Sequence, residues 1–503
     1  YIANLLVAGL MTFTGCTDGF ESDNANKAGY TPELQEYDLQ KYVLNLGVMQ
    51  QGIYFNYDWG KGTDWTFQTI QNLGHDMFAG YFHDMNNSFN DKNSVYALND
   101  GWTGSAWTYT YGPIVYTKFG QEEGDNVDSQ EAAYRQFFKD LDEGVKLINE
   151  YKKDNAALEP FAAADILMPA GKRTLSQWVK FANSLRLRLA IRVSMSAPDL
   201  ARAEVAKAMD ATAGGVLESA DETVAVSTES GYKNPLGTVN EGWGEVFMGA
   251  TMESVLVGYN DPRLIKYYSK AEGGDIKDEK GNLIIAERNK IAGTYKGVPQ
   301  GTGVTVKDEN RYRLHSKSTI TKQTDAILMT AAEVWFLRAE AALRGFTSEN
   351  VKDCYEKGIT VSCQQWGVNV GDYLTSDATP SDYVDAFEAK YDVKALIKVT
   401  PKWDGGASPE EQLERILTQK WIACYPEGYE AWTEQRRTGY PQLFKVFVNN
   451  SGGAIDTDIR IRRLPYPSDI QKNNPTQYSA LKKALGGEDN GGTRLWWDTG
   501  RNF

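Results

Sequence analysis

Residues 332–345 carry the pattern that most limits what this chain can fold into. Alanines and large apolar residues recur there at helical spacing, Gly345 ends the pattern, and a second helical pattern occupies residues 351–359. Small residues such as Ala339 let two helices approach closely. One such pair cannot bury its own apolar face, so it needs neighbours. The pattern therefore predicts a helix pair inside a larger helical body.

This helix pair resembles a tetratricopeptide unit. Its first helix mixes small and aromatic residues, a glycine turn follows, and the second helix ends in Tyr-x-Lys-small-aliphatic. Residues 129–151 and 174–211 are candidates for neighbouring units, although their spacing is irregular. An ordinary helical hairpin is the alternative, and we favour the repeat.

Start signals mark further helices. Thr174 and Gln177 fit a capping box. Ser408 and Glu411 fit a second one, with a proline in the first turn. Pro198 suits the first turn of another helix. These signals predict helices that begin at about 175, 198 and 409.

Two of the expected helices have apolar stripes. The helix that opens at residues 128–131 should turn five residues inward: Tyr134, Phe138, Leu141, Val145 and Ile148. After Thr174, one stripe is formed by Leu175, Trp178, Ala182, Leu185 and Leu189, and Arg186, Arg188 and Arg192 fall largely off it.

Three long segments, residues 52–128, 213–322 and 366–406, lack helical periodicity. They are rich in Gly, Asn, Asp and Thr, but they also hold many aromatic residues, which disordered segments lack. We expect ordered, packed loops. The predicted fold is mostly α: tetratricopeptide-like helix pairs form a superhelical scaffold, covered by long irregular loops with a few short strands.

The N-terminal segment ends at Cys16 after an apolar stretch too short to span a membrane stably. Small residues before the cysteine and polar chain after it are the layout of a bacterial lipoprotein signal, although Phe13 is a looser fit than Leu. We expect residues 1–15 to be a signal peptide, truncated at its start, and Cys16 to carry acyl chains such as palmitate. A buried N-terminal helix that happens to hold a cysteine is the alternative.

Composition excludes several classes of function. The net charge of -14 argues against nucleic acid as a partner. Only three histidines occur, and no His-Glu-x-x-His motif is present, so no metal or other cofactor is expected. Residues 275–282 lack the spacing of a calcium loop and are expected to form an acidic turn. No nucleophile elbow or phosphate-binding loop occurs.

The remaining cysteines, Cys354, Cys363 and Cys424, form no CxxC motif. We expect buried free thiols. One disulfide with an odd thiol left over is the alternative.

Several segments, in order, resemble the SusD/RagB family of nutrient-binding outer-membrane lipoproteins. They are ILMTAAEVWFLRAEA at 327–341, ILTQKW at 416–421 with GYEAWTEQRRTG at 428–439, and RRLPYPSDIQKNNP at 462–475. YNDPRL at 259–264 and WWD at 496–498 are also similar to the family. Each motif is weak alone, but their order together with Cys16 is specific.

The resemblance implies a fold and a partner. Four tetratricopeptide-like helix pairs would support a loop-rich ligand site within one nutrient-binding domain at residues 16–503. The protein would sit in the outer membrane, facing the cell exterior, and pass oligosaccharides to a SusC-like TonB-dependent transporter without catalysis. Oligopeptide ligands, a secreted glycoside hydrolase and a pure protein-interaction scaffold are the alternatives.

The motif arginines Arg436, Arg437, Arg462 and Arg463 lie beside aromatic residues and prolines. We expect them to hold the C-terminal segment onto the helices rather than to bind ligand.

A sugar site needs exposed aromatic rings for the C–H faces of the sugar and polar groups for its hydroxyls. Aromatic residues concentrate at residues 54–65, 101–112 and 241–245. In the second cluster they alternate with Thr, as on one face of a strand. Any single tryptophan is more often part of a core. The candidate stacking residues are Trp59, Trp65, Trp102, Trp107 and Tyr109, and the candidate hydroxyl acceptors are Asp58 and Asp64.

Overall fold

The structure is a computed structural model that describes residues 46, 50, 64–83, 89, 91–111, 127–303 and 310–503. Cys16 and the expected signal peptide lie outside these residues. Within the described part, no helix is both long enough and apolar enough to cross a membrane.

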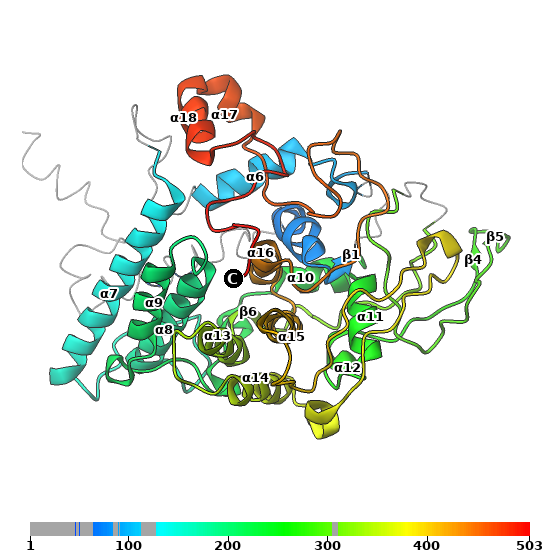
Figure 1. Cartoon of the computed structure of the whole chain (residues 1–503). Coiled ribbons are helices and arrows are strands. Elements are labelled where there is room, and N and C mark those ends of the chain that lie inside the picture. The colour runs from blue at the N-terminus through cyan, green and yellow to red at the C-terminus, as the bar shows by residue number, and fades with distance from the viewer. Residues whose placement is uncertain are drawn as a thin grey trace, which may run out of the picture.

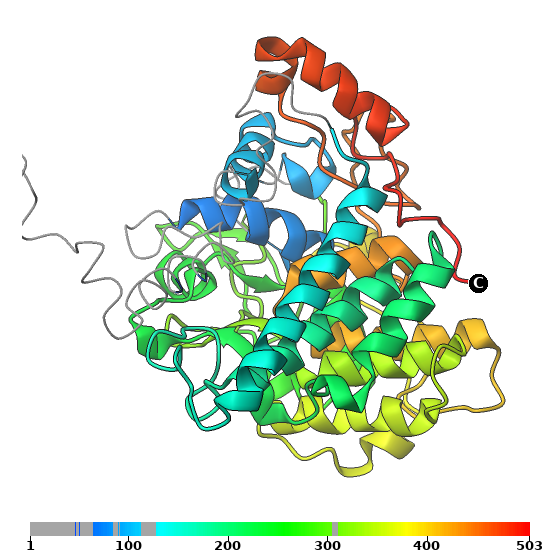
Figure 2. The same ribbon diagram turned by 90° about the vertical axis from the view of Figure 1, so that its left-hand side faces the viewer.

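A layer of long helices forms most of the body. It consists of α7 (Gln130–Asp154), α8 (Leu175–Arg192), α9 (Pro198–Ala208), α13 (Ala331–Leu343), α14 (Val351–Gln365), α15 (Pro409–Ala423) and α16 (Gly428–Thr438). Consecutive helices pack as pairs, α8 with α9 and α13 with α14, and α13 also contacts α8 and α15. Figure 2 shows α7 on the outside of this layer, across α8. The prediction of a mostly helical scaffold is confirmed.

Shorter elements cover one side of the helical layer. The helices are α5 (Trp65–Phe67), α6 (Asp100–Tyr111), α10 (Pro235–Gly237), α11 (Ala250–Gly258), α12 (Leu264–Tyr267), α17 (Ser468–Asn473) and α18 (Pro475–Leu485), with π-helical segments η2 (Gln68–Asp76) and η7 (Thr238–Gly242). Short 3-10 turns are η3 (Asn93–Val95), η4 (Ala211–Ala213), η5 (Ala220–Glu222), η6 (Thr228–Ser230), η9 (Gly371–Thr375) and η10 (Ala389–Tyr391).

Among the residues that the structure describes, each strand pairs with one other strand. Each pair is antiparallel: β1 (Phe82–His83) with β3 (Phe247–Met248), β2 (Val224–Val226) with β6 (Ala326–Met329), and β4 (Ile276–Lys277) with β5 (Leu283–Ile285). The turn between β4 and β5 is the predicted acidic turn, in which the Asp278 carboxylate accepts from the backbone N–H groups of Lys280 and Asn282.

The predicted helix starts are confirmed. The Thr174 hydroxyl accepts from Gln177 N, and Ser408 and Glu411 form a complete capping box. Pro198 occupies the first turn of α9. Each cap satisfies a backbone N–H that has no partner inside the helix. Ser129 caps α7, on which Phe138 and Val145 are buried as predicted, whereas Tyr134, Leu141 and Ile148 are only partly buried.

The stripe predicted for α8 is wrong in part. Val179, Leu187 and Ile191 are fully buried, whereas Trp178 and Leu189 are only partly so. Arg186 was placed off the buried face, but its side chain is buried between Asp142 and Glu204. The reason is that α8 contacts α7, α9 and α13, so it is covered on more than one side.

The alternation of aromatic residues and threonines in 101–112 predicted a strand, and this is also wrong, because residues 100–111 form helix α6. The Asn99 carboxamide oxygen accepts from Trp102 N at 3.0 Å, which caps the first turn. Segment 213–322 was also expected to be loop, which is wrong in part, because it contains the helices α10, α11 and α12. Segment 366–406 is the ordered loop that was expected, with the short turns η9 and η10.

Three of the four motif arginines hold the C-terminal segment, as expected, whereas Arg437 binds Glu340 on α13 and Glu434 on α16. Arg436 donates to the backbone carbonyl of Arg462, and Arg462 donates to that of Arg436 and to the Asp498 carboxylate. Arg463 pairs with Asp489 at 2.6 Å. These contacts tie the chain around 462 and the C-terminal segment to α16. Cys354, Cys363 and Cys424 are buried free thiols.

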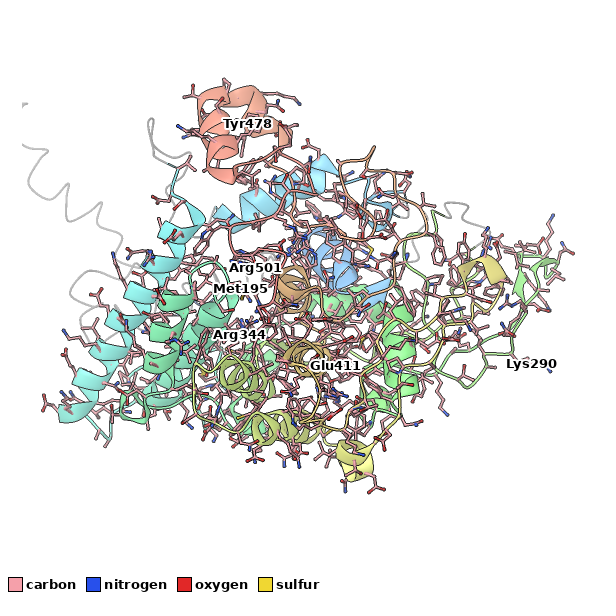
Figure 3. The ribbon with its side chains drawn as sticks, viewed as in Figure 1. Met195, Lys290, Arg344, Glu411, Tyr478 and Arg501 are labelled. Atoms are coloured by element: carbon pink, nitrogen blue, oxygen red, sulfur yellow. The ribbon has the colours of Figure 1, made fainter. Side chains whose placement is uncertain are left out.

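The extreme C-terminus is held by Arg344, at the end of α13. Its guanidinium donates to Asn502 O at 2.6 Å and lies over the Phe503 ring. Figure 3 shows Arg344 near Met195 and Arg501, where the end of the chain returns to the helical layer.

Candidate functional site

The π-helical segment η2 lies between the aromatic clusters and the helical layer. All nine of its residues are buried, including the polar Gln68, Asn72 and Asp76. It follows α5 directly and packs against α6 on one side and α16 on another. The Asp76 carboxylate accepts from Gly428 N, where a Cβ on Gly428 would lie 2.4 Å from the Asp76 Cα. Such π-helical segments occur frequently at functional sites.

Part of the first aromatic cluster lies at the start of α5. Trp65 is 48% exposed, and Asp64 before it is half-buried with its carbonyl bonded to Gln68 N. Asp58 and Trp59 lie outside the described residues.

The third cluster is joined to the first through η2. The Gln68 carboxamide donates to the Glu245 carboxylate, and Trp243, close to Glu245 in the chain, is 41% exposed. The structure therefore brings together segments that are 177 residues apart. Trp243 was not among the predicted site residues, although its cluster was recognised in the sequence.

The second cluster forms α6, which divides its aromatic residues between two faces. Trp102 and Tyr109 are seven residues apart and share one face, where Trp102 meets the Phe89 ring at 5.4 Å. Trp107 points to a different side, where its ring meets Tyr466 edge-on at 5.8 Å. All three candidate residues on α6 are half-buried. They do not form one continuous platform.

A polar hollow of about 490 Å³ opens at the N-terminal end of α6, and we call it the upper hollow. It is lined by Asp91, Lys92, Tyr96, Ala97, Leu98, Asn99, Asp100, Asn450, Ser451, Ala454, Ile455, Pro465, Asp489, Asn490 and Gly491. None of the predicted site residues that the structure describes lines it. Asn99 lies more than 350 residues before Asn450 and Asn490 in the chain, so only the fold could have brought the three carboxamides together.

The carboxylates of Asp100 and Asp489 in the upper hollow are hydrogen-bonded to other parts of the protein. Asp100 accepts from the Ser468 hydroxyl and from Ser468 N, and these bonds lower the pKa of Asp100 below its usual value. Asp489 accepts from Arg463 and from Tyr466 N. The carboxamides of Asn99, Asn450 and Asn490 supply neutral donors and acceptors, which match the hydroxyl groups of an uncharged sugar.

Two carboxyl groups whose pKa is raised by burial lie elsewhere. Burial raises the pKa of Glu253 to about 7 against the opposing effect of Lys296, which binds it at 2.6 Å. Burial also raises the pKa of Glu427 to about 7, and Glu427 accepts from Tyr429 N at the start of α16. Neither residue lines the upper hollow. The part of the chain that the structure describes holds no cluster of His, Cys, Asp and Glu that could bind a metal.

The helical layer of packed helix pairs, with short strand pairs and loops on one side, defines a mostly helical class of protein. Residues 23–111 and 107–498 match the family model of the SusD-like proteins, described as SusD and RagB outer membrane lipoproteins. The chain belongs to this family.

Solved structures agree with the family. A SusD homologue from Bacteroides vulgatus is 48% identical, with a TM-score of 0.84 over 93% of this chain and 100% of that one. A chitin-binding SusD homologue from Flavobacterium johnsoniae is 32% identical, with a TM-score of 0.78 over 90% and 99%. A SusD homologue from Bacteroides thetaiotaomicron is 27% identical, with a TM-score of 0.75 over 91% and 99%. A comparison with curated proteins gave no match.

Proposed function

We propose that the protein is a non-catalytic lipoprotein that binds oligosaccharides at the cell surface and delivers them to a TonB-dependent outer-membrane transporter. In this proposal residues 1–15 are the signal peptide, Cys16 carries the lipid, and residues 16–503 form one binding domain. The observation that carries the proposal is the position of exposed and half-exposed aromatic residues around η2, next to the polar upper hollow.

This arrangement offers the two kinds of contact that a sugar makes. Trp102 and Tyr109 on one face of α6 supply apolar ring surface. The carboxamides of the upper hollow supply hydrogen bonds at the end of the same helix. Rigid aromatic side chains bind at a low cost in conformational entropy. The other proposed contacts are Trp59, Trp65 and Trp107 for stacking and Asp58 and Asp64 for hydroxyl groups.

The family supports the cellular setting of the proposal. Its description as outer membrane lipoproteins supports the lipid anchor and the location. The relative from Flavobacterium johnsoniae is described as chitin-binding and is similar over 90% of this chain, so chitin oligosaccharides are the first ligands to test.

The test is calorimetry of the full chain with chitin oligosaccharides, other neutral glycans and mixed oligopeptides. We expect glycan binding, weakened at least about tenfold by Trp102→Ala with Tyr109→Ala, because truncating a buried aromatic contact costs more than about 1 kcal/mol. The matched control is Trp335→Ala with Tyr151→Ala, which removes the same ring types from α13 and α7.

Each of the other outcomes would change a different part of the proposal. Binding of peptides alone would be consistent with a role in uptake, but the ligands would then be oligopeptides and not glycans. Steady turnover of a glycan by the purified chain would overturn the non-catalytic role. An equal loss of affinity in the control variant, Trp335→Ala with Tyr151→Ala, would show that the binding site is not on α6.

A further inference from the structure

A second and larger hollow, of about 870 Å³, lies far from α6. We call it the lower hollow, and it is lined by Val257, Asn260, Asp261, Pro262, Leu264, Ile265, Lys266, Lys270, Gly293, Thr294, Tyr295, Gly367, Val368 and Asn369. It is formed by the end of α11, by α12 and by the loops at 260–262, 270, 293–295 and 367–369. Figure 1 shows α12 in the lower half of the molecule and α6 near the top. Its volume is in the range of small-ligand sites.

Apolar side chains stand exposed in this hollow. Ile265 is 61% exposed and Val257 is 38% exposed, and the Tyr295 ring beside them is half-buried. Large apolar groups gathered in a concave surface are typical of binding sites, whereas single ones on a convex surface need no explanation. One wall of the hollow can therefore receive the C–H face of a ring.

The charge of the hollow is positive. Lys266 and Lys270 are exposed, and neither ammonium group has an ion pair or hydrogen bond with any described residue. The only acidic residue in the lining is Asp261. Its carboxylate accepts hydrogen bonds from the Arg263 guanidinium and from the Tyr373 hydroxyl. In a chain with a net charge of -14, this is a local site for an anion.

The floor of the hollow is rigid. Arg263 and Asp261 are both fully buried, and Arg263 also donates to Ser362 on α14 and to Gln419 on α15. Asn260 beside them has a φ of 52°, a left-handed conformation that few residues other than glycine adopt. Because the floor is tied to α14 and α15, the backbone that carries Ile265 and Lys266 keeps its place without a ligand, which reduces the cost of binding.

We propose that the lower hollow is a second ligand site, which takes a hexuronate unit of an acidic oligosaccharide. The C–H face of the sugar lies against Ile265 and Tyr295, and its carboxylate is bound by Lys266 and Lys270. A neutral hexose has the same ring but no carboxylate, so it loses both charge-assisted contacts. The site is separate from the glycan site proposed at α6 and does not depend on it.

The experiment is calorimetry of the full chain with tetragalacturonate and with a neutral galactose tetrasaccharide, at low and at physiological salt. We expect tetragalacturonate to bind, more weakly in higher salt, and to lose at least about tenfold in affinity in Lys266→Gln with Lys270→Gln. The pair Lys266→Arg with Lys270→Arg keeps the charge and should retain most of the binding.

A second pair of variants tests the apolar wall. Ile265→Glu places a like charge beside the ligand carboxylate and should abolish binding, while Leu283→Glu makes the same change at an exposed residue of β5 and should not. Both positions are exposed, so unfolding temperatures should stay equal. Absence of tetragalacturonate binding, or equal affinity in the Lys→Gln pair, would overturn the proposal, as would loss of binding in the Trp102→Ala and Tyr109→Ala variant.

Discussion

Arg437 shows how single residues hold this fold together. Its guanidinium binds Glu340 on α13 with two hydrogen bonds of 2.8 Å, and Glu434 one turn earlier on α16. Arg437 and Glu340 are each 1% exposed. Burial alone would raise the pKa of Glu434, but Arg437 and Lys420 outweigh it and lower that pKa to about 2. The carboxylates are therefore charged and depend on their partners.

Arg437→Leu should lower the free energy of unfolding by about 3 kcal/mol, because it removes one cation from two buried carboxylates and leaves Glu340 with Arg344 and Glu434 with Lys420. The matched control is Arg135→Leu on α7, whose partner Glu131 is an exposed neighbour four residues away. That change should cost less than about 1 kcal/mol. Urea unfolding of the two variants measures the difference, and equal midpoints would contradict the structural role assigned to Arg437.

The sequence indicated the role of this arginine but not its partners. Its position beside aromatic residues and prolines predicted a structural contact with the C-terminal segment, whereas the structure shows a structural contact with α13. Glu340 lies 97 residues away, and nothing in the spacing of the two motifs pairs them. Chemistry can be inferred from residue type, whereas the partner is set by the packing of α13 on α15 and α16.

At the scale of elements, the contact of α13 with α14 depends on one glycine. A Cβ on Gly358 would lie 2.8 Å from ring atoms of Phe336, which is fully buried. The two helices therefore approach closely because α14 has no side chain at this point. Gly144 on α7 is also within a helix, but a Cβ there would meet nothing within 4 Å.

Gly358→Ala should destabilise the protein by about 1–2 kcal/mol, since overpacking outweighs the gain in helix propensity. Gly144→Ala should instead be neutral or stabilise it by up to about 1 kcal/mol. Thermal unfolding of both variants distinguishes the two effects. A stabilised Gly358→Ala variant would mean that Phe336 moves aside easily.

Helix α6 shows where the prediction of elements from sequence failed. The alternation of Trp107, Tyr109 and Tyr111 has the period of a strand, yet the segment is helical. The cap at Asn99 and the packing of α6 against η2 decide the conformation, and both depend on residues outside the alternating stretch. Long helices with capping signals, such as α7 and α15, were predictable because their signals are local.

At the scale of the molecule, the candidate site combines residues that are distant in the chain. Asn99 and Asn490 line one hollow, and Gln68 binds Glu245. Aromatic clusters could be found in the sequence because each is contiguous. The carboxamides of the upper hollow could not be found, because single asparagines are common in loops and only the returning C-terminal segment brings them to α6.

Buried titratable groups of opposite kinds determine how the whole molecule responds to acid. Burial, with a smaller contribution from nearby cations, lowers the pKa of His75 and of His315 from 6.5 to about 3. Burial raises the pKa of Glu253 and of Glu427 from 4.5 to about 7. In the unfolded chain all four groups return to their usual values.

The lowered pKa values of the two histidines and the raised pKa values of the two glutamates have opposite effects on stability as the pH falls. The histidines bind protons only in the unfolded state between pH 6.5 and 3, so they destabilise the fold as the pH falls. The two glutamates bind protons in the folded state first, so they stabilise it as the pH falls from 7 to 4.5. We expect the unfolding temperature to change little between pH 6.5 and 4.5. Below pH 4.5 it should fall steeply, because the glutamates add nothing further and Glu434 must be protonated.

Two variants should change the pH dependence of the unfolding temperature in opposite directions. His315→Leu removes one destabilising group, so its unfolding temperature should rise as the pH falls from 6.5 to 4.5. Glu253→Gln removes one stabilising group, so its unfolding temperature should fall over the same range. Scanning calorimetry of both variants at half-unit steps of pH measures the two slopes. Parallel profiles for the two variants and the unmodified chain would show that these groups titrate alike in the folded and unfolded states, and that the acid response arises elsewhere.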